Sequence, residues 1–99
     1  MTTQEIHLND IPLVEPLRSP RSRQPIANQY VVYSKDYRTF QSYGSIIVAI
    51  DNSTRQVYLN RTYWNYSKTT SKYRAIFLRE TTKETEAKIK SGEYILTDL

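Results

Sequence analysis

The sequence predicts a small α+β domain, with an antiparallel sheet of three to five strands and two or three short helices in the C-terminal half. Two patterns indicate this class. Between residues 29 and 59, runs of β-branched and aromatic residues alternate with turn residues, as in successive hairpins. After residue 60, capping residues and apolar residues at helical spacing replace that pattern. The chain has 99 residues, which is enough for one such domain.

Residues 1–28 are predicted to form a proline-containing N-terminal arm, in front of a single α+β domain at residues 29–99. The arm holds all four prolines of the chain: Pro12, Pro16, Pro20 and Pro25. Proline lacks an amide hydrogen and restricts the residue before it, so the arm suits neither a helix nor a central strand. Six large aliphatic residues lie between positions 6 and 17. The arm is therefore either a flexible leader or a segment that packs along its own domain, or it orders on a partner. We expect it to be dispensable for folding and to contribute to binding.

The strands are expected at residues 30–33, 38–43, 46–50 and 55–59. The continuous apolar run at 46–50 is typical of a strand that is covered on both faces. Short polar residues at 51–54 have turn chemistry, so residues 45–59 predict a hairpin. Residues 94–96 are expected to close the sheet as an edge strand.

The helices are predicted from caps and spacing. Asn60 can cap a short helical turn through residues 63 and 64. Apolar residues at 73, 76 and 77 form one helical stripe, with a cap expected at Thr69, Thr70 or Ser71. A capping box is predicted from Thr81 and Glu84, and this last helix should run to about Ser91, before Gly92.

The composition argues against an enzyme, a cofactor and a metal site. Two glycines cannot build a glycine-rich phosphate loop, and no cysteine is present. The one histidine, His7, lies in the arm, far in sequence from an acid–base partner. Glu80 and Glu84 are interleaved with lysines, so a solvated salt-bridge face is expected there. No apolar run approaches 18 residues, so no membrane span is expected.

Charge and aromatic residues both concentrate in the middle of the chain. Residues 29–78 carry seven Lys and Arg against two Asp, a net charge of +5. Eight of the nine tyrosines lie in the same segment, more than a small core can bury with hydrogen-bonded hydroxyls. An exposed aromatic and basic face is therefore predicted. Its binding residues are expected to be Arg61, Tyr63, Tyr66, Lys68, Lys72, Tyr73 and Arg74. By its spacing, Trp64 should instead anchor the core.

The C-terminal two thirds resembles a family of small uncharacterised bacteriophage proteins. The resemblance covers about residues 30–99 and rests on four motifs, YWNYS at 63–67, TTSKYR at 69–74, FL at 77–78 and KSGEY at 90–94. Many such proteins carry glycine after the Phe–Leu pair, where this chain has Arg79. The resemblance implies a phage context, the cytoplasm of the infected bacterial host, and no agreed activity.

Small phage proteins without catalytic residues are often inhibitors of host defence, including anti-CRISPR proteins, and this association leads to the first functional hypothesis. The protein would inhibit a host nucleic-acid-targeting complex by occupying a protein surface, with a host protein or nucleoprotein complex as its partner. The alternative is a DNA- or RNA-binding accessory protein that uses its tyrosine, arginine and lysine face. A third hypothesis is a structural role in the virion or in replication.

Overall fold

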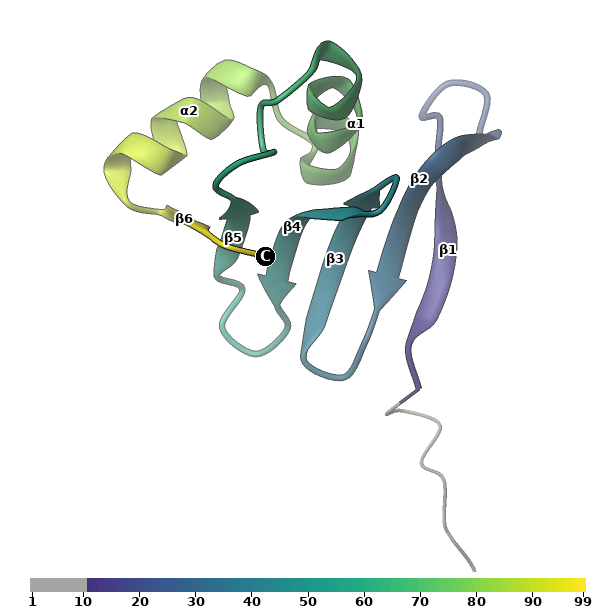
Figure 1. Ribbon diagram of the computed structural model, residues 1–99, viewed down its shortest axis with the longest axis horizontal. Coiled ribbons are helices and arrows are strands. Elements are labelled where there is room, and N and C mark those ends of the chain that lie inside the picture. Colours follow the sequence, from purple (N-terminus) through teal and green to yellow (C-terminus); the bar gives the residue numbers. More distant parts are fainter. Residues whose placement is uncertain (1–10) are drawn as a thin grey trace, which may run out of the picture.

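A computed structural model describes residues 11–99 and contains one six-stranded sheet with two helices (Figure 1). The elements in chain order are β1 (Leu13–Arg18), β2 (Pro25–Tyr33), β3 (Tyr37–Ser42), β4 (Ser45–Asp51), β5 (Val57–Asn60), α1 (Lys68–Leu78), α2 (Thr82–Ser91) and β6 (Tyr94–Thr97). Neighbours in the sheet follow the same order, from β1 at one edge to β6 at the other.

The sheet is mixed, so the prediction of an antiparallel sheet with three to five strands is wrong. Strands β1 to β5 pair antiparallel, whereas β6 pairs parallel to β5. A parallel pair requires a long crossover, and here the crossover contains both helices. The α+β class with two helices in the C-terminal half agrees with the structure.

The additional strand is β1, which comes from the segment predicted to be the N-terminal arm. Pro16 lies in β1, an edge strand, and Pro25 is the first residue of β2; sheets tolerate proline at both kinds of position. Leu17 is only 6% exposed and belongs to the core. Because β2 runs across position 28, the predicted boundary between arm and domain is not a structural one. Residues 1–10, and with them His7, lie outside the described residues.

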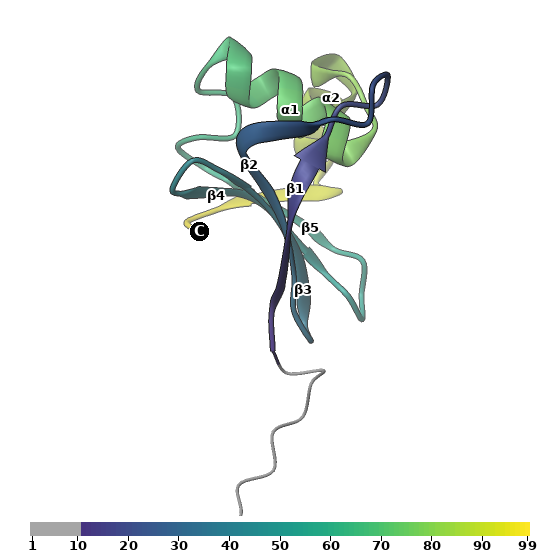
Figure 2. The ribbon, with the colours of Figure 1, turned by 90° about the vertical axis from the view of Figure 1, so that its right-hand side faces the viewer.

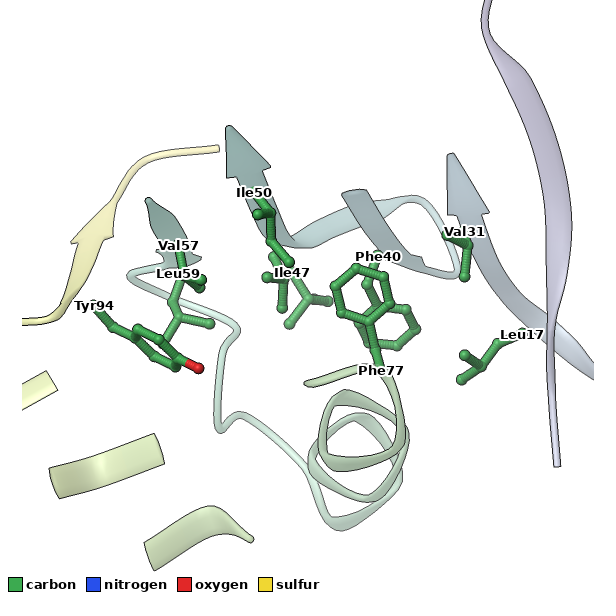
Figure 3. Packing of buried hydrophobic residues seen from close by; sticks show 10 residues of the cluster. Leu17, Val31, Phe40, Ile47, Ile50, Val57, Leu59, Phe77 and Tyr94 are labelled. Atoms are coloured by element: carbon green, nitrogen blue, oxygen red, sulfur yellow. The ribbon is translucent and has the colours of Figure 1, made fainter. Parts of the chain in front are cut away.

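The core lies between one face of the sheet and the two helices. Figures 1 and 2 show both helices on the same side of the sheet. In Figure 3, the ring of Phe40 from β3 faces that of Phe77 from α1, and the two stack with centroids 5.6 Å apart. Arg38 lies 5.1 Å over the Phe77 ring, and Lys88 of α2 lies 5.2 Å over the ring of Tyr94. Side chains of this face therefore contact both helices.

Helix α1 begins earlier than predicted. Its N-cap is Ser67, whose hydroxyl accepts a hydrogen bond from the amide of Thr70 at 3.1 Å, so the cap expected at Thr69, Thr70 or Ser71 is wrong. Its predicted apolar stripe is confirmed, because Phe77 is buried while Tyr73 and Ile76 pack against the core. Arg79 ends the helix in the left-handed conformation, with φ of 57°.

Helix α2 follows the prediction closely. Thr81 and Glu84 form the reciprocal capping box. Gly92 ends the helix with φ of 85°, which a glycine adopts without strain. The hairpin of β4 and β5 and the edge position of β6 are confirmed as well.

One face of the sheet carries no described helix, which corrects the expectation that β4 is covered on both faces. Ile47, Val48 and Ile50 belong to the core cluster beneath the helices. Ile46, in the same apolar run, is 37% exposed. The run is thus apolar on a face that the rest of the described chain leaves open.

Candidate functional site

Three exposed tyrosines from two separate segments line one pocket. Tyr43 comes from the turn between β3 and β4, and Tyr63 and Tyr66 come from the turn that follows β5. Their side chains are 60%, 38% and 68% exposed. We call this hollow of about 270 Å³ the tyrosine pocket. Its remaining lining residues are Ser42, Ser45, Ile47 and Thr70.

Hydrogen bonds of its own backbone hold Tyr43 in place. The two-residue turn of Tyr43 and Gly44 joins β3 to β4, with Ser42 paired to Ser45. Tyr43 has φ of 54°, a conformation that costs an L-residue about 1–2 kcal/mol. Its amide donates to the carbonyl of Asn28 at 2.7 Å, and its carbonyl accepts from Gln41 Nε2 at 2.9 Å. These contacts fix the backbone that carries the exposed ring.

Asn60 positions the other two tyrosines. Its Oδ1 accepts hydrogen bonds from the amides of Thr62 and Tyr63, both at 2.9 Å, so the predicted capping role is confirmed. Its Nδ2 donates to the carbonyl of Ile46 on β4, at 2.9 Å. The buried side chain of Asn60 thereby fastens the turn at residues 61–66 to the sheet. The segment is a hydrogen-bonded turn and not a regular helix.

The rings of Tyr63 and Tyr66 meet edge to face, with centroids 5.3 Å apart and planes at 88°. This arrangement is favourable for two aromatic rings and keeps their faces at a fixed angle. Trp64, between them in the sequence, packs against the core instead. The predicted division between a core tryptophan and a surface Tyr66 is therefore confirmed.

Arg74 does not lie on the surface, which corrects its place among the predicted binding residues. The side chain is completely buried in α1, with its guanidinium 5.0 Å over the Trp64 ring. Nη1 donates to the Trp64 carbonyl, and Nη2 donates to Thr82 Oγ1 at 2.8 Å. Burial lowers the pKa of Arg74, while the nearby charges of Glu80 and Glu86 oppose that shift. Arg74 thus joins the tyrosine-bearing turn to both helices.

The other predicted cations remain accessible. Arg61 is exposed at the start of the turn, and its amide donates to the carbonyl of Thr97 at 2.9 Å. Lys68 and Lys72 are exposed and lie one turn apart on α1. Tyr73 is half-buried against the core, and the ammonium of Lys72 lies 5.5 Å over its ring. Tyr73 therefore supports Lys72 and contributes little free surface of its own.

The sequence analysis did not identify Ser42, which lines the pocket. Ser42 is 4% exposed, yet its hydroxyl has no hydrogen-bond partner among the described residues. The same holds for Oε1 of Gln29, which is paired with Ser42 across β2 and β3. A buried polar atom without a partner costs free energy and is rare. The only available signal in the sequence was the turn-forming dipeptide at 43–44.

A second polar cluster is structural. Glu80, between the helices, has a side chain only 4% exposed and is not part of a solvated face as predicted. Its carboxylate accepts from Lys88 Nζ at 2.7 Å, from the Tyr94 hydroxyl at 3.0 Å and from Thr85 Oγ1 at 2.8 Å. The hydrogen bond to Glu80 raises the pKa of Lys88. Burial, followed by the bond to Glu80, raises the pKa of Tyr94.

Residues 11–99 contain neither a cluster of metal ligands nor a membrane-spanning helix. No group of three or more histidine, aspartate or glutamate side chains in this part of the chain could hold a metal ion. Neither described helix is long and apolar enough to cross a membrane.

The fold and the pocket define an α+β domain with one helix-covered sheet face and an aromatic surface site. The chain belongs to the Family of unknown function DUF8033, which matches residues 14–93. This match includes β1, in agreement with the place of that strand in the sheet. No curated protein and no solved structure matches the chain. The family description states neither an activity nor a source, so the resemblance to phage proteins stays a prediction.

Proposed function

We propose that the protein is a non-enzymatic binding protein that takes single-stranded nucleic acid at the tyrosine pocket. The observation that supports this function is the convergence of Tyr43, Tyr63 and Tyr66 around a hollow lined by the unpartnered hydroxyl of Ser42. Aromatic side chains stack on bases of any sequence, and each stacked base contributes about 1–3 kcal/mol. The Ser42 hydroxyl can exchange a hydrogen bond with the edge of such a base.

The size and charge of the site agree with this ligand. The volume of about 270 Å³ is below the range of drug-sized ligands, about 300–1,000 Å³, and suits one planar ring. Arg61, Lys68 and Lys72 are exposed on the turn and on α1, the same segments that supply Tyr63, Tyr66 and Thr70 to the pocket. Cations of this kind contact phosphates. A duplex hides its base faces, so a single strand is the favoured substrate.

Fluorescence anisotropy with a labelled twelve-nucleotide oligo(dT) or oligo(U) tests this proposal. We expect Tyr66→Ser and Tyr63→Ser each to weaken binding by about 1–3 kcal/mol, the value of one stacked base. Tyr33→Ser is the matched control, because Tyr33 is 39% exposed, close to the 38% of Tyr63, and lies outside the pocket. Equal losses for Tyr33 and Tyr63, or no binding by the wild type, would contradict the proposal.

The cations are tested by salt titration. Binding to single strands weakens with salt by about 0.7 logarithmic units per phosphate contact. The variant Arg61→Ser/Lys68→Ser/Lys72→Ser should therefore reduce the slope by about 2 and keep the wild-type thermal melt. A slope that does not change would remove these three side chains from the interface.

The inhibitor hypothesis uses the same exposed tyrosines on a different partner. Tyrosine also dominates protein–protein hot spots, and the site would then occupy a protein surface of a host defence complex in the cytoplasm of an infected bacterium. Phosphate contacts make nucleic-acid binding strongly salt-dependent, whereas a tyrosine-centred protein interface changes little with salt. Retention on a purified nuclease-treated host complex in 500 mM salt would favour the inhibitor.

A further inference from the structure

The sheet face opposite the helices presents a row of side chains that crosses all six strands. Consecutive strand pairings connect Val14 with Val32, Val32 with Thr39, Thr39 with Ala49, Ala49 with Tyr58, and Tyr58 with Ile95. We call the face that carries this row the open face. Directly opposite residues of neighbouring strands point to the same side, so the row is continuous. None of its six members is charged.

The open face is largely apolar, exposed at its edges and hollowed, while Ala49 near its centre is only 7% exposed. Val14 is 57% exposed at one edge, Ile95 is 42% exposed at the other, and Ile46 is 37% exposed between them. A groove of about 540 Å³, twice the volume of the tyrosine pocket, lies on this face. Its lining includes Val32, Thr39, Ala49 and Tyr58 of the row. Both helices contact the other face, so within residues 11–99 no element covers the groove.

The area of the open face approaches what a stable interface requires. The strands have between four and nine residues each, and at a rise of about 3.3 Å per residue and a spacing of about 4.8 Å they give a flat area of about 570 Å². The relief of the side chains increases the accessible area above this value. A standard protein interface uses about 800 Å² of accessible surface from each partner. The largest apolar patch on a typical monomer covers about 300–600 Å², and the groove on this face is lined by polar residues such as Thr39 and Thr97 as well as by apolar ones.

Charge identifies the partner. The chain has a net charge of +4, so two copies repel each other wherever their cations meet. Arg61, Lys68 and Lys72, the cations of the proposed nucleic-acid site, belong to the turn and helix beyond β5 and not to the row. A polyanion or an acidic peptide gains nothing from a row without charges. A second copy, in contrast, offers the same uncharged row, and among the described residues Asp98 is the one charged residue that lines the groove beside it.

We propose that the open faces of two copies pack against each other and form a symmetric dimer with a two-sheet sandwich at its centre. Face-to-face sheets lie about 10 Å apart, with their side chains interdigitated. A two-fold axis uses the same patch on both copies, as most homodimers do. The helices and the tyrosine pockets then remain on the outer sides of the dimer, available for other partners.

Adjacent residues of β1 provide a matched pair of variants. Val14 and Leu13 are both 57% exposed, but Val14 belongs to the open-face row while Leu13 pairs with Tyr33 on the other side of the sheet. Sedimentation equilibrium of the full chain should give twice the 11.7 kDa mass of one chain at 100 µM. Val14→Lys should weaken self-association at least tenfold, and Leu13→Lys should change it less than twofold. Circular dichroism verifies that both variants fold.

The contrary results are distinct. A wild-type chain that stays monomeric at 1 mM would overturn the proposal. If Leu13→Lys weakens association as much as Val14→Lys does, the contact lies at the unpaired edge of β1, and the proposal is also overturned. A second measurement on the wild type is the dilution dependence of NMR amide shifts. We expect the amide shifts of Thr39, Ala49 and Tyr58 to change on dilution. Shift changes confined to α1 or α2 would refute the open face as the interface.

Discussion

Several single residues adopt backbone conformations that their side chains disfavour. Positive φ angles occur at five non-glycine residues among those described: Arg23, Asn28, Tyr43, Arg55 and Arg79. Asparagine tolerates this region of φ, whereas the same region is unfavourable for tyrosine and arginine. Strained residues are frequent at binding sites, and the exposed ring of Tyr43 lines the proposed binding pocket. Arg79, in contrast, lines no part of that pocket.

Glycine substitutions should separate strain from function. Tyr43→Gly and Arg79→Gly each relieve a left-handed backbone, so both should stabilise the fold by up to about 1 kcal/mol. Only Tyr43→Gly removes a pocket ring and should weaken oligonucleotide binding. Chemical denaturation and anisotropy measure the two effects. Equal binding by both variants would show that the strain at Tyr43 serves the turn alone.

Arg74 should act on stability and not on binding directly. Arg74→Ala removes two hydrogen bonds from a charged donor, each of which contributes about 1.5–3 kcal/mol. We expect the free energy of unfolding to fall by about 3 kcal/mol or more. Arg61→Ala, at an exposed position in the same segment, should change stability by about 0.5 kcal/mol at most. A wild-type melting temperature for Arg74→Ala would contradict the buried contacts.

At the scale of elements, β1 decides whether the N-terminal segment belongs to the fold. It is an edge strand with one buried apolar side chain, Leu17, and exposed ones at Leu13 and Val14. Its pairing with β2 also helps to cover Val31, which is 8% exposed. The element is therefore a working part of the sheet, although its prolines suggested otherwise.

Two leucines of this strand provide the test. Leu17→Ala should destabilise the protein by about 2–5 kcal/mol, because it opens a cavity in the core. Leu13→Ala, at an exposed position, should cost about 0.5 kcal/mol or less. Denaturant unfolding followed by circular dichroism measures both values. If both variants unfold like the wild type, the strand contributes nothing to stability and the free-arm prediction is restored.

At the scale of the whole molecule, one buried carboxylate connects three elements. Glu80 follows α1, and its partners Lys88 and Tyr94 belong to α2 and β6. The pKa of both partners is raised in the folded protein. A raised pKa means that the unfolded chain loses its proton first, so the stabilisation is complete below the unfolded pKa and decreases as the pH rises above it.

Alkaline titration should therefore reveal this cluster. Unfolded lysine and tyrosine titrate near pH 10, so the melting temperature should begin to fall above about pH 10. Glu80→Gln should lower stability at neutral pH and flatten this alkaline decline. Glu93→Gln is the control, because Glu93 lies 3.8 Å from Lys88 and is 61% exposed. An equal effect of both substitutions would show that the buried position of Glu80 is unimportant.

Local rules predicted most elements, and long-range contacts account for the errors. The capping box at Thr81, the stop at Gly92 and the β4–β5 hairpin depend on neighbouring residues and were found from the sequence. The place of β1 depends on an edge that only the assembled sheet defines, since proline is excluded from central strands and tolerated at edges. Arg74 has the composition of a surface residue, and only the approach of Trp64 and Thr82 explains its burial. Tyr43 was missed because its distance from Tyr63 in sequence conceals their shared pocket.

The parallel pairing of β6 with β5 has a consequence for the order of folding. Strands β1 to β5 form a meander of adjacent hairpins, which close short loops on the microsecond scale. The connection from β5 to β6 contains the 33 residues between Asn60 and Tyr94, and both helices lie within it. Long loop closure raises the entropic barrier, so we expect β6 and α2 to dock after the meander has formed. In pulsed hydrogen exchange, the amides of β3 and β4 should accordingly gain protection before those of β6.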